Sequence, residues 1–411
     1  MNVLLVHPRG AGQFRYLAAH LAAGGSRVTV VCEEQDVTIP GVRFVRHAGT
    51  TTRPPASAEL SHLGVADRMV QHAYRVAETL SAIRRAEGEP DVVLGHTGWG
   101  SLLFVGEALP RTPAFGYCEY YFNRVGGDLG FDPEVPVTIA ELGRARVRNF
   151  VQRATLEAIA GGLSPTAWQR SRYPATVRSR IAICHEGIDT AVCAPSSHAT
   201  FALPDGRVLK AGDPVVTYAA RGLEPYRGFP QFMRAAAKVA RRRGDITFIV
   251  AGGDDVAYGR SAPGGITWRA HMLAETHIDP SRVVFLGTVD HAVLVRLFQV
   301  SAVHVYLTVP FVLSWSMLEA MACGALVLGS RTAPVEEVIA DGQNGLLTDF
   351  FDIDGLAARI VAAVDRRAAL TGLRRAARAT VERRYRRSEM LARQSAILAD
   401  AAGSARSARF G

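Results

Sequence analysis

The sequence predicts an α/β protein made of two doubly wound, Rossmann-like domains, each with a parallel sheet between layers of helices. The chain has 411 residues, which is more than one hydrophobic core usually holds. Short β-rich runs alternate with helical patterns, and this alternation occurs twice, over 1–184 and over 215–330. A hydrophobic content of 48% and a charged content of 21% are typical of a globular chain and argue against disorder.

The first series of elements begins with "NVLLV" at the start of the chain. No basic leader precedes this run, so it is read as a first strand and not as a signal peptide. Helical patterns such as "FRYLAAHLAAGG" separate several of the strands. The strands of this series are expected at 2–6, 27–32, 91–96, 114–118 and 180–184.

The second series repeats the pattern after a stretch rich in Pro, Gly and Ser at 194–214, which is the expected linker. Strands are expected at 215–221, 246–253, 282–287, 303–307 and 325–330, and helices at 229–243, 291–300 and 316–324. The predicted domains are therefore 1–193 and 215–385. The last segment, 386–411, is expected to be a helix and tail that packs back on the first domain.

Charge and cysteine content restrict the class of partner and the compartment. The net charge of +9 suits phosphate-bearing ligands or an anionic membrane face. The basic clusters at 241–243 and 383–387 lie in helical patterns without interleaved aromatic residues, which favours solvated helix faces over a nucleic-acid site. The five cysteines are scattered and lack the spacing of zinc sites, and no apolar run is long enough to cross a bilayer. We expect a cytoplasmic protein with reduced thiols and no nucleic-acid partner.

Ligands of paired α/β domains bind beyond the carboxyl ends of the strands, so residues that follow strands are the candidates. Gly12 lies in the turn after the first strand and could bring backbone N–H groups to an anion, or could simply form a strand-to-helix turn. Arg221 ends the strand at 215–221 and Arg227 lies at the entry to the next helix, so both could reach one diphosphate. His96 ends another strand and could face an acceptor or serve in packing.

The stretch "SWSMLEAMACG" keeps one carboxylate, Glu319, in an otherwise apolar helix. The helix should open at Ser314 to Ser316, where unpaired N–H groups and the positive end of the dipole favour a phosphate. Glu319 could then accept hydrogen bonds from both hydroxyls of a ribose. The alternative is a carboxylate that only stabilises the helix N-terminus.

Several motifs together resemble a known family. "LEAMACGALVLGS" followed by "APVEEVIADGQNGLL" is similar to the donor-binding signature of group 4 glycosyltransferases, which are retaining, nucleotide-sugar-dependent enzymes of GT-B fold. The likeness spans nearly the whole chain and includes "GAGQFRYLAAHLAAGGSRVTVV", "HEGIDT", "RGLEPYRGF" and "VVFLGTVD". It implies two domains that face a central cleft.

The resemblance also implies roles for particular residues. Arg221 and Arg227 correspond to the basic pair on the donor diphosphate, and Glu319 to the glutamate that binds the ribose. The donor-binding set implied is Gly12, Gly287, Thr288, Ser314, Trp315, Ser316, Met317, Leu318 and Glu319.

The sequence departs from the family pattern at three places. Phe311 stands where a second glutamate usually contacts the sugar, and Phe cannot replace the hydrogen bonds of a carboxylate. Arg227 replaces the more common lysine and keeps the charge. Where a histidine often follows the fourth strand, this chain offers Glu119 with Tyr120. Glu119 could orient the sugar or the acceptor, or could anchor the loop by accepting from tyrosine hydroxyls.

The resemblance thus implies transfer of a sugar, with retention, from a nucleotide-sugar to a hydroxyl of a saccharide or glycoconjugate. The catalytic group is Arg221, Arg227 and Glu119, with His96 and Tyr120 on the acceptor side. No bound cofactor and no metal are expected, because "GGDD" at 252–255 is typical of a solvated turn. A nucleotide-sugar epimerase or a non-catalytic nucleotide-sugar-binding protein is the alternative. The basic charge also predicts peripheral contact with an anionic membrane.

Overall fold

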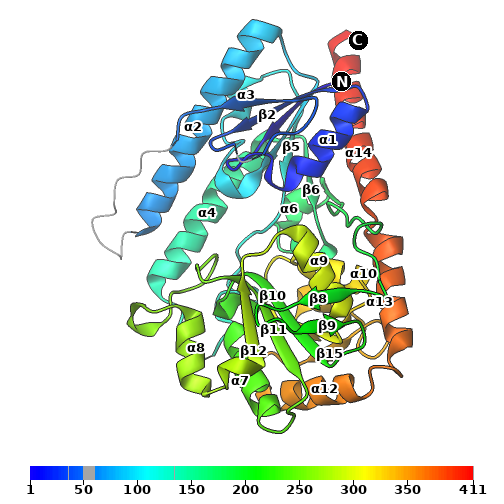
Figure 1. Ribbon diagram of the computed structural model, residues 1–411. Coiled ribbons are helices and arrows are strands. Elements are labelled where there is room, and N and C mark those ends of the chain that lie inside the picture. Colours follow the sequence, from blue (N-terminus) through cyan, green and yellow to red (C-terminus); the bar gives the residue numbers. More distant parts are fainter. Residues whose placement is uncertain (36, 50–60, 134, 411) are drawn as a thin grey trace. The chain divides into compact units, whose positions relative to one another are not determined.

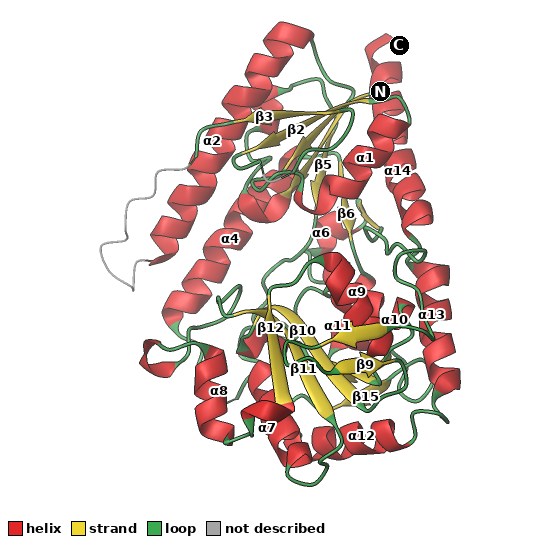
Figure 2. Ribbon diagram, viewed as in Figure 1, coloured by secondary structure: helices red, strands yellow, loops and turns green. Residues whose placement is uncertain are grey.

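The computed structural model describes residues 1–35, 37–49, 61–133 and 135–410. Its chain divides into two compact units, shown in Figure 1. One unit comprises Met1–Gly187 together with Arg387–Gly411, and the other comprises Ile188–Arg386. Each is an α/β domain with its own parallel sheet, as the sequence predicts (Figure 2).

The first unit contains a parallel sheet of seven strands in the order β3-β2-β1-β4-β5-β6-β7. Because the order reverses after β1, the sheet is doubly wound, and a crevice opens beyond the ends of β1 and β4. The strands are β1 (Asn2–Val6), β2 (Arg27–Cys32), β3 (Val42–Arg46), β4 (Val92–His96), β5 (Ala114–Tyr117), β6 (Gly161–Ser164) and β7 (Ile181–Ile183). The helices are α1 (Arg15–Ala23), α2 (Ser61–Glu87), α3 (Val105–Ala108), α4 (Ile139–Ala158), α5 (Ala167–Ser171), α6 (Ala175–Arg178) and α14 (Arg387–Phe410), with short 3-10 turns η1 (Gly12–Phe14) and η3 (Thr97–Trp99).

The central strands of this sheet are buried on both faces, which explains why β1, β2 and β4 are nearly continuous apolar runs. Along β1, Val3 and Leu5 point into a core that includes residues of α1 and α14, while Leu4 and Val6 point into a second core under α2. The C-terminal helix α14 contributes Leu391 to the first of these cores. The end of the chain is therefore part of the first unit.

The second unit contains a parallel sheet of six strands in the order β12-β11-β10-β13-β14-β15. This is again the doubly wound order, with its switch point between β10 and β13. The strands are β10 (Val215–Gly222), β11 (Thr247–Gly253), β12 (Val283–Gly287), β13 (Val303–Tyr306), β14 (Leu326–Ser330) and β15 (Leu346–Thr348). The helices are α7 (Phe229–Ala240), α8 (Trp268–Thr276), α9 (His291–Val300), α10 (Trp315–Ala322), α11 (Ala333–Glu336), α12 (Ile353–Asp365) and α13 (Thr371–Arg384), with 3-10 turns η4 (Pro225–Arg227), η5 (Pro263–Gly265) and η6 (Pro280–Arg282).

The expected linker at 194–214 differs from the structure. The second unit already begins at Ile188, and this stretch forms an antiparallel hairpin of β8 (Thr200–Ala202) and β9 (Val208–Lys210). Phe201 and Leu209, on facing positions of the hairpin, are buried in the core of the second unit. Burial of these two side chains is the reason that a Pro- and Gly-rich segment is folded here.

Strands β3, β6 and β15 were not expected from the sequence. The clearest case is β6, whose sequence "GGLS" has no β-rich pattern. Its glycines are required by close packing, because a Cβ at Gly162 would lie 2.8 Å from the Cys118 sulfur. Within the described residues, no helix is both long enough and apolar enough to span a membrane.

Candidate functional site

Two groups of polar side chains lie at the carboxyl ends of the strands, one group in each unit. In the second unit, Arg221 lies near the end of β10 with an exposed side chain, and η4 follows. Gly228, after η4, has a left-handed φ of 64°, and a Cβ there would overlap the Leu307 side chain. Only glycine therefore allows this tight path from β10 into α7.

Arg227 is buried, with 7% of its surface exposed. Its Nη1 donates to the Thr308 hydroxyl at 2.8 Å, to the Val312 carbonyl at 3.0 Å and to the Tyr306 hydroxyl at 3.3 Å. No hydrogen bond joins its Nε or Nη2 to any other described residue. Nη1 is thus held in place, while Nε and Nη2 retain N–H donors for a ligand.

Phe311 belongs to an aromatic group beside Arg227. Its ring lies 5.4 Å from that of Tyr226 and 5.3 Å from that of Tyr258, between ring centroids. The Arg227 guanidinium lies over the Tyr258 and Phe311 rings, at 5.5 and 5.8 Å from their centroids. These contacts are in the range of cation–π attraction, so Phe311 holds the arginine without supplying a carboxylate.

Glu224 is a residue that the sequence analysis missed. It is fully buried, and its carboxylate accepts hydrogen bonds from the backbone N–H groups of Tyr258 and Gly259 at distances from 2.6 to 3.1 Å. The loop after β11 is thereby fastened to η4. In the sequence, Glu224 is marked only as an acid before Pro225 and close to an arginine. The loop that it binds lies more than thirty residues away, so the sequence does not indicate the contact.

Helix α10 begins at Trp315, within one residue of the expected start. Ser314 is its N-cap: the Ser314 hydroxyl accepts from the Ser316 N–H at 3.3 Å, and the Ser314 N–H donates to the Tyr306 hydroxyl at 2.8 Å. Tyr306 thus connects the helix start to Arg227. Met317 and Leu318 are fully buried core residues, so only the helix backbone near them could meet a ligand.

Glu319 lies in the second turn of α10 and is 5% exposed. Its Oε1 forms a hydrogen bond with Nε2 of His291, the first residue of α9, at 2.9 Å. His291 was not predicted from the sequence. Nearby, Gly287 ends β12 with a left-handed φ of 69°, and Thr288 follows with an exposed side chain.

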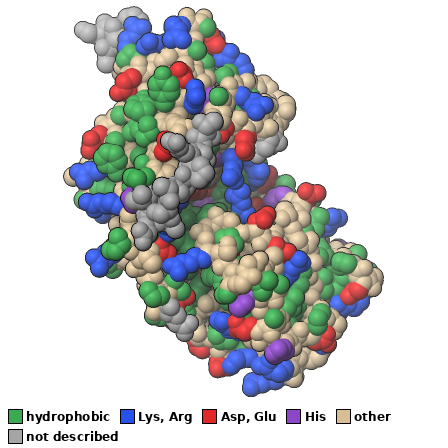
Figure 3. Space-filling model, turned by 90° about the vertical axis from the view of Figure 1, so that its left-hand side faces the viewer, with side chains coloured by type: hydrophobic (Ala, Val, Ile, Leu, Met, Phe, Trp, Pro, Cys, Tyr) green, Lys and Arg blue, Asp and Glu red, His purple; other side chains and the backbone are tan. Residues whose placement is uncertain are grey.

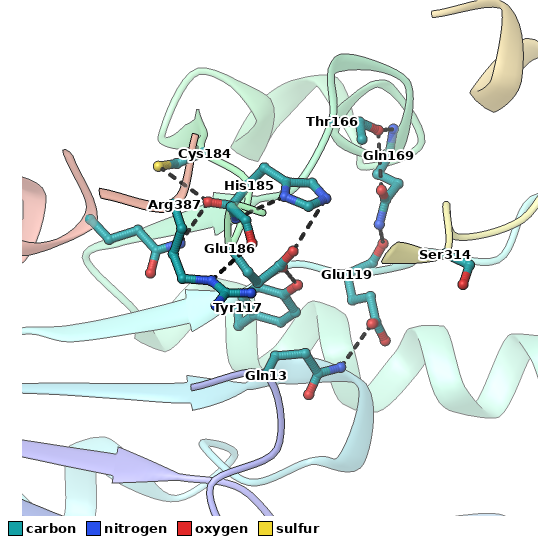
Figure 4. Close-up of polar contacts among 12 residues, drawn as sticks. Gln13, Tyr117, Glu119, Thr166, Gln169, Cys184, His185, Glu186, Ser314 and Arg387 are labelled. Atoms are coloured by element: carbon teal, nitrogen blue, oxygen red, sulfur yellow. Dashed lines mark hydrogen bonds and ion pairs between the residues drawn. The ribbon is translucent and has the colours of Figure 1, made fainter. Parts of the chain in front are cut away.

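In the first unit the central residue is Glu119, which follows β5 (Figure 4). Its Oε2 lies 3.2 Å from Nε2 of His96, and its Oε1 accepts from the Gln13 amide at 2.8 Å. Nδ1 of His96 accepts from the Gly98 N–H at 3.0 Å, which leaves the proton on Nε2 to be donated to Glu119. The sequence therefore identified two residues, His96 and Glu119, that form one hydrogen-bonded pair.

Two opposing effects set the pKa of Glu119. Burial raises the pKa, but the hydrogen bond and charge of His96 and the hydrogen bond of Gln13 together outweigh it. The pKa of this carboxyl is therefore below its usual range. Glu119 is a carboxylate near neutral pH, able to accept hydrogen bonds but not to act as a general acid.

His7 lies at the end of β1, beside this pair. Its ring centroid is 5.8 Å from that of His96, and burial together with His96 lowers the pKa of His7 to about 4. Gly12 has a left-handed φ of 46°, and a Cβ there would overlap the His7 ring. The Gly12 N–H donates to the Arg9 carbonyl at 3.0 Å, so this N–H is used within the turn and is not presented to an anion.

Tyr120, expected on the acceptor side, is buried. Its hydroxyl donates to the Asp128 carboxylate at 2.6 Å and accepts from the Asp128 N–H at 3.3 Å. Both hydrogen bonds of the hydroxyl close the loop 120–128, so Tyr120 has a structural role in place of the expected acceptor contact.

A second buried group lies in the "HEGIDT" motif (Figure 4). The Tyr117 hydroxyl donates to the Glu186 carboxylate, whose other oxygen lies 3.4 Å from Nε2 of His185. Burial lowers the pKa of His185 to about 3, so the ring is neutral. These residues fix the end of β7.

The "GGDD" turn contains an ion pair. Asp254 Oδ2 lies 2.5 Å from Nη2 of Arg269, and Asp255 is exposed. The described residues contain a group of acidic, histidine and cysteine side chains that lie close enough to share a metal ion, and this group lies outside the "GGDD" turn. It consists of Cys193, His291 and Glu319, whose ligand atoms lie within 4.8 Å of one another.

Family models match both units. One, described as the glycosyl transferase family 4 group, matches residues 24–193, and another, glycosyl transferases group 1, matches residues 213–366. The D-inositol 3-phosphate glycosyltransferase of Mycolicibacterium smegmatis is 28% identical over 193 residues, which are 46% of this chain and 41% of that protein. A GDP-mannose-dependent alpha-(1-6)-phosphatidylinositol monomannoside mannosyltransferase of the same organism is 24% identical over 81% of this chain and 78% of its own length. The match thus spans about two fifths of the first relative.

Solved structures share the fold. Sucrose-phosphate synthase from Thermosynechococcus elongatus superposes with a TM-score of 0.73 and 19% identity, covering 97% of this chain and 98% of the other. Anabaena HepE in complex with UDP-glucose superposes with a TM-score of 0.69 and 14% identity, covering 97% and 100%. At these identities the likeness shows a common fold of two Rossmann-like domains.

Proposed function

Because the chain belongs to the glycosyltransferases of the family 4 group, we propose that it moves a sugar, with retention, from a nucleotide-sugar donor to a hydroxyl of a saccharide or glycoconjugate. We assign the donor to the second unit and the acceptor to the first. The observation that carries this proposal is Arg227, a buried guanidinium held at Nη1 and linked through Tyr306 to the N-terminus of α10.

On the donor side, the retained N–H donors of Arg227, the exposed Arg221 and the N-terminus of α10 supply positive charge for a diphosphate. Glu319 would accept from the ribose hydroxyls, and its hydrogen bond to His291 sets the direction of its carboxylate. The half-buried ring of Phe311 gives the sugar an apolar neighbour where relatives in the resemblance offer a carboxylate.

In the reaction, the bond between the anomeric carbon and the phosphate oxygen breaks, and a bond to the acceptor oxygen forms on the same face. The acceptor proton passes to the departing phosphate oxygen. Arg221, Arg227 and the α10 N-terminus would stabilise the charge that grows on the diphosphate, and loss of one such contact costs about 10²-fold or more in rate. Glu119, held by His96 and Gln13, would accept a hydrogen bond from the acceptor or the sugar.

The test is a thermal-shift screen with UDP, GDP, ADP and dTDP, followed by donor consumption with the NDP-sugar whose nucleotide binds. Structural neighbours were solved with UDP-glucose, and a sequence relative is named for GDP-mannose, so both nucleotides belong in the screen. Stabilisation by one nucleotide and release of it from its NDP-sugar are expected. Binding without turnover would instead support a non-catalytic binding protein, the alternative that Phe311 favours.

We also propose peripheral contact of the first unit with an anionic membrane face. On α2 and α4, which pack against each other, apolar side chains are exposed, including Tyr74 at 55%, Phe150 at 73% and Ile139 at 84%. Arg68 and Arg146 are exposed on the same helices, and Figure 3 shows basic and hydrophobic side chains side by side on this face. Apolar insertion and basic charge each strengthen binding to anionic lipid.

Co-sedimentation with vesicles tests this contact, with and without anionic lipid, at low and high salt. A Phe150→Ser, Arg146→Ser double variant should lose lipid-dependent, salt-sensitive binding. Equal sedimentation with neutral and anionic vesicles would reject the proposal and leave a freely diffusible acceptor.

A further inference from the structure

Three side chains of the second unit bring together a sulfur, a nitrogen and an oxygen ligand. Cys193 precedes the β8–β9 hairpin, His291 begins α9, and Glu319 lies on α10. Their ligand atoms lie within 4.8 Å of one another, and His291 Nε2 is 2.9 Å from Glu319 Oε1. The three elements that hold them meet in one buried core, which fixes their mutual positions.

We propose that Cys193, His291 and Glu319 form a Zn²⁺ site that regulates the enzyme by competing with the nucleotide-sugar donor for Glu319. The competition rests on the proposed function, because it requires that Glu319 bind the donor. The binding of the metal does not depend on the proposed function.

The geometry suits this ion. Zinc binds Cys sulfur at about 2.3 Å, His nitrogen at about 2.0–2.1 Å and carboxylate oxygen at about 2.0–2.2 Å, in a tetrahedron. Such bonds place neighbouring ligand atoms about 3.3–3.6 Å apart. Since the ligand atoms lie within 4.8 Å of one another, side-chain shifts of at most about 1.5 Å reach these values. A set of one thiolate, one imidazole and one carboxylate favours Zn²⁺ over Mg²⁺, which prefers oxygen ligands.

Charge and access also suit the ion. The Arg378 guanidinium donates to the carbonyls of Cys193 at 3.0 Å and Ala322 at 2.6 Å, which fixes the backbone at Cys193 relative to the end of α10. Cys193 is fully buried, but the His291 side chain is 40% exposed and gives an entry path. A thiolate and a carboxylate together neutralise a divalent ion, which limits the cost of burying it.

A fourth ligand is within reach. Cys323 follows Glu319 by one turn of α10, is 2% exposed, and its thiol is hydrogen-bonded with that of Cys193. The open position would be taken by water or by the Cys323 sulfur after deprotonation.

The test uses the full-length chain, reduced and freed of metal by a chelator. Titration with Co²⁺ should give the visible bands of a tetrahedral ion and the near-ultraviolet band of thiolate-to-cobalt charge transfer, at one ion per chain, and Zn²⁺ should displace it. Mg²⁺ should give no competition. Cys193→Ser should abolish the charge-transfer band, and His291→Gln should weaken binding by at least about 10–100-fold.

Cys184→Ser and His271→Gln are the matched controls, since both residues lie outside the cluster and should leave Co²⁺ binding unchanged. Because His291 is at the surface, its variant keeps the test decisive if Cys193→Ser does not fold. Absence of the charge-transfer band, or binding unaffected by both cluster variants, overturns the site.

The nucleotide found in the thermal-shift screen is then added to the cobalt-loaded protein. Release of Co²⁺ as the nucleotide binds supports the competition. Co²⁺ retained alongside bound nucleotide overturns the competition and the donor role of Glu319, while the metal site stands. Nucleotide binding that depends on Glu319 in a chain that takes up no Co²⁺ overturns the metal site alone.

Discussion

Arg227→Ala should lower both stability and activity, whereas Arg221→Ala should lower activity alone, although Arg221 lies near the end of β10 and Arg227 only six residues later in η4. Arg227→Ala removes the donor to Tyr306, Thr308 and Val312 from a buried site. Arg221→Ala removes an exposed side chain that forms no hydrogen bond or ion pair with the described residues. The first change affects the folded state as well as the ligand, and the second affects only the ligand.

The magnitude follows from the contacts of Arg227. Each of its three hydrogen bonds contributes about 1 kcal/mol net. The contacts with the Tyr258 and Phe311 rings add about 0.5–1 kcal/mol each. The free energy of unfolding should fall by about 4–5 kcal/mol, which a domain of ordinary stability survives. For a unit of this size that corresponds to a decrease in Tm of roughly 8–20 °C.

For Arg221→Ala the expected change in unfolding free energy is within about 0.5 kcal/mol, because the side chain is exposed and away from the core. Its effect should be confined to donor affinity and turnover, with a rate loss of about 10²-fold if it contacts the leaving diphosphate.

The assay measures Tm by circular dichroism and turnover at saturating donor for both variants and for Arg227→Lys. Lysine keeps the charge and can donate from one nitrogen, as Nη1 does, but it lacks the free Nε and Nη2 donors, so it should restore part of the Tm and less of the turnover. Equal Tm for Arg227→Ala and the wild type would refute the anchoring role. A large loss of Tm in Arg221→Ala would show that this arginine also supports the fold.

Three further changes test other parts of the structure. Glu319→Ala should weaken nucleotide binding roughly 10- to 150-fold in calorimetry, as expected for one lost charge-assisted hydrogen bond, and Glu319→Gln should lose less; unchanged affinity in both would reject the ribose contact. Gly12→Ala should lower unfolding free energy by about 1–3 kcal/mol more than Gly25→Ala, since both glycines have positive φ but only Gly12 adjoins the His7 ring, and equal losses would contradict the overlap. In the folded chain the pKa of His7 is lowered to about 4 and that of His72 to about 3, so both stay neutral above about pH 4. In the unfolded chain the same residues bind protons below about pH 6.5. Stability is therefore complete above pH 6.5 and falls as the pH falls toward 4, so urea midpoints that stay constant between pH 7.5 and 4.5 would rule out this linkage.

The alternation of apolar runs and helical patterns was sufficient to predict five strands of each sheet, because strands buried on both faces form recognisable apolar runs. The same holds for the start of α10, where Ser314 precedes the helix and caps it. The residues at which the two units begin and end could not be predicted from this alternation. The hairpin at 200–210 is held by two side chains that pack into a distant core, a long-range contact that local composition does not record.

For the candidate site, residues at strand ends were identifiable, since parallel strands bring their carboxyl ends to one edge. His96 and Glu119 were found in this way, 23 residues apart in sequence and 3.2 Å apart between Nε2 and Oε2. The sequence determined which chemical groups reach each edge. Only the tertiary structure decided which of them are paired.

Arg227, Glu224 and His291 show the physical reason. Each is part of a pair or network whose partners are brought close by packing of other elements: Arg227 with Tyr306, Glu224 with the loop after β11, and His291 with Glu319. Burial and hydrogen bonding of a side chain depend on those non-local contacts. Residue type and the local periodicity of apolar residues do not. Whether an arginine is exposed or anchored, and whether a carboxylate is paired, is therefore set by the folded chain.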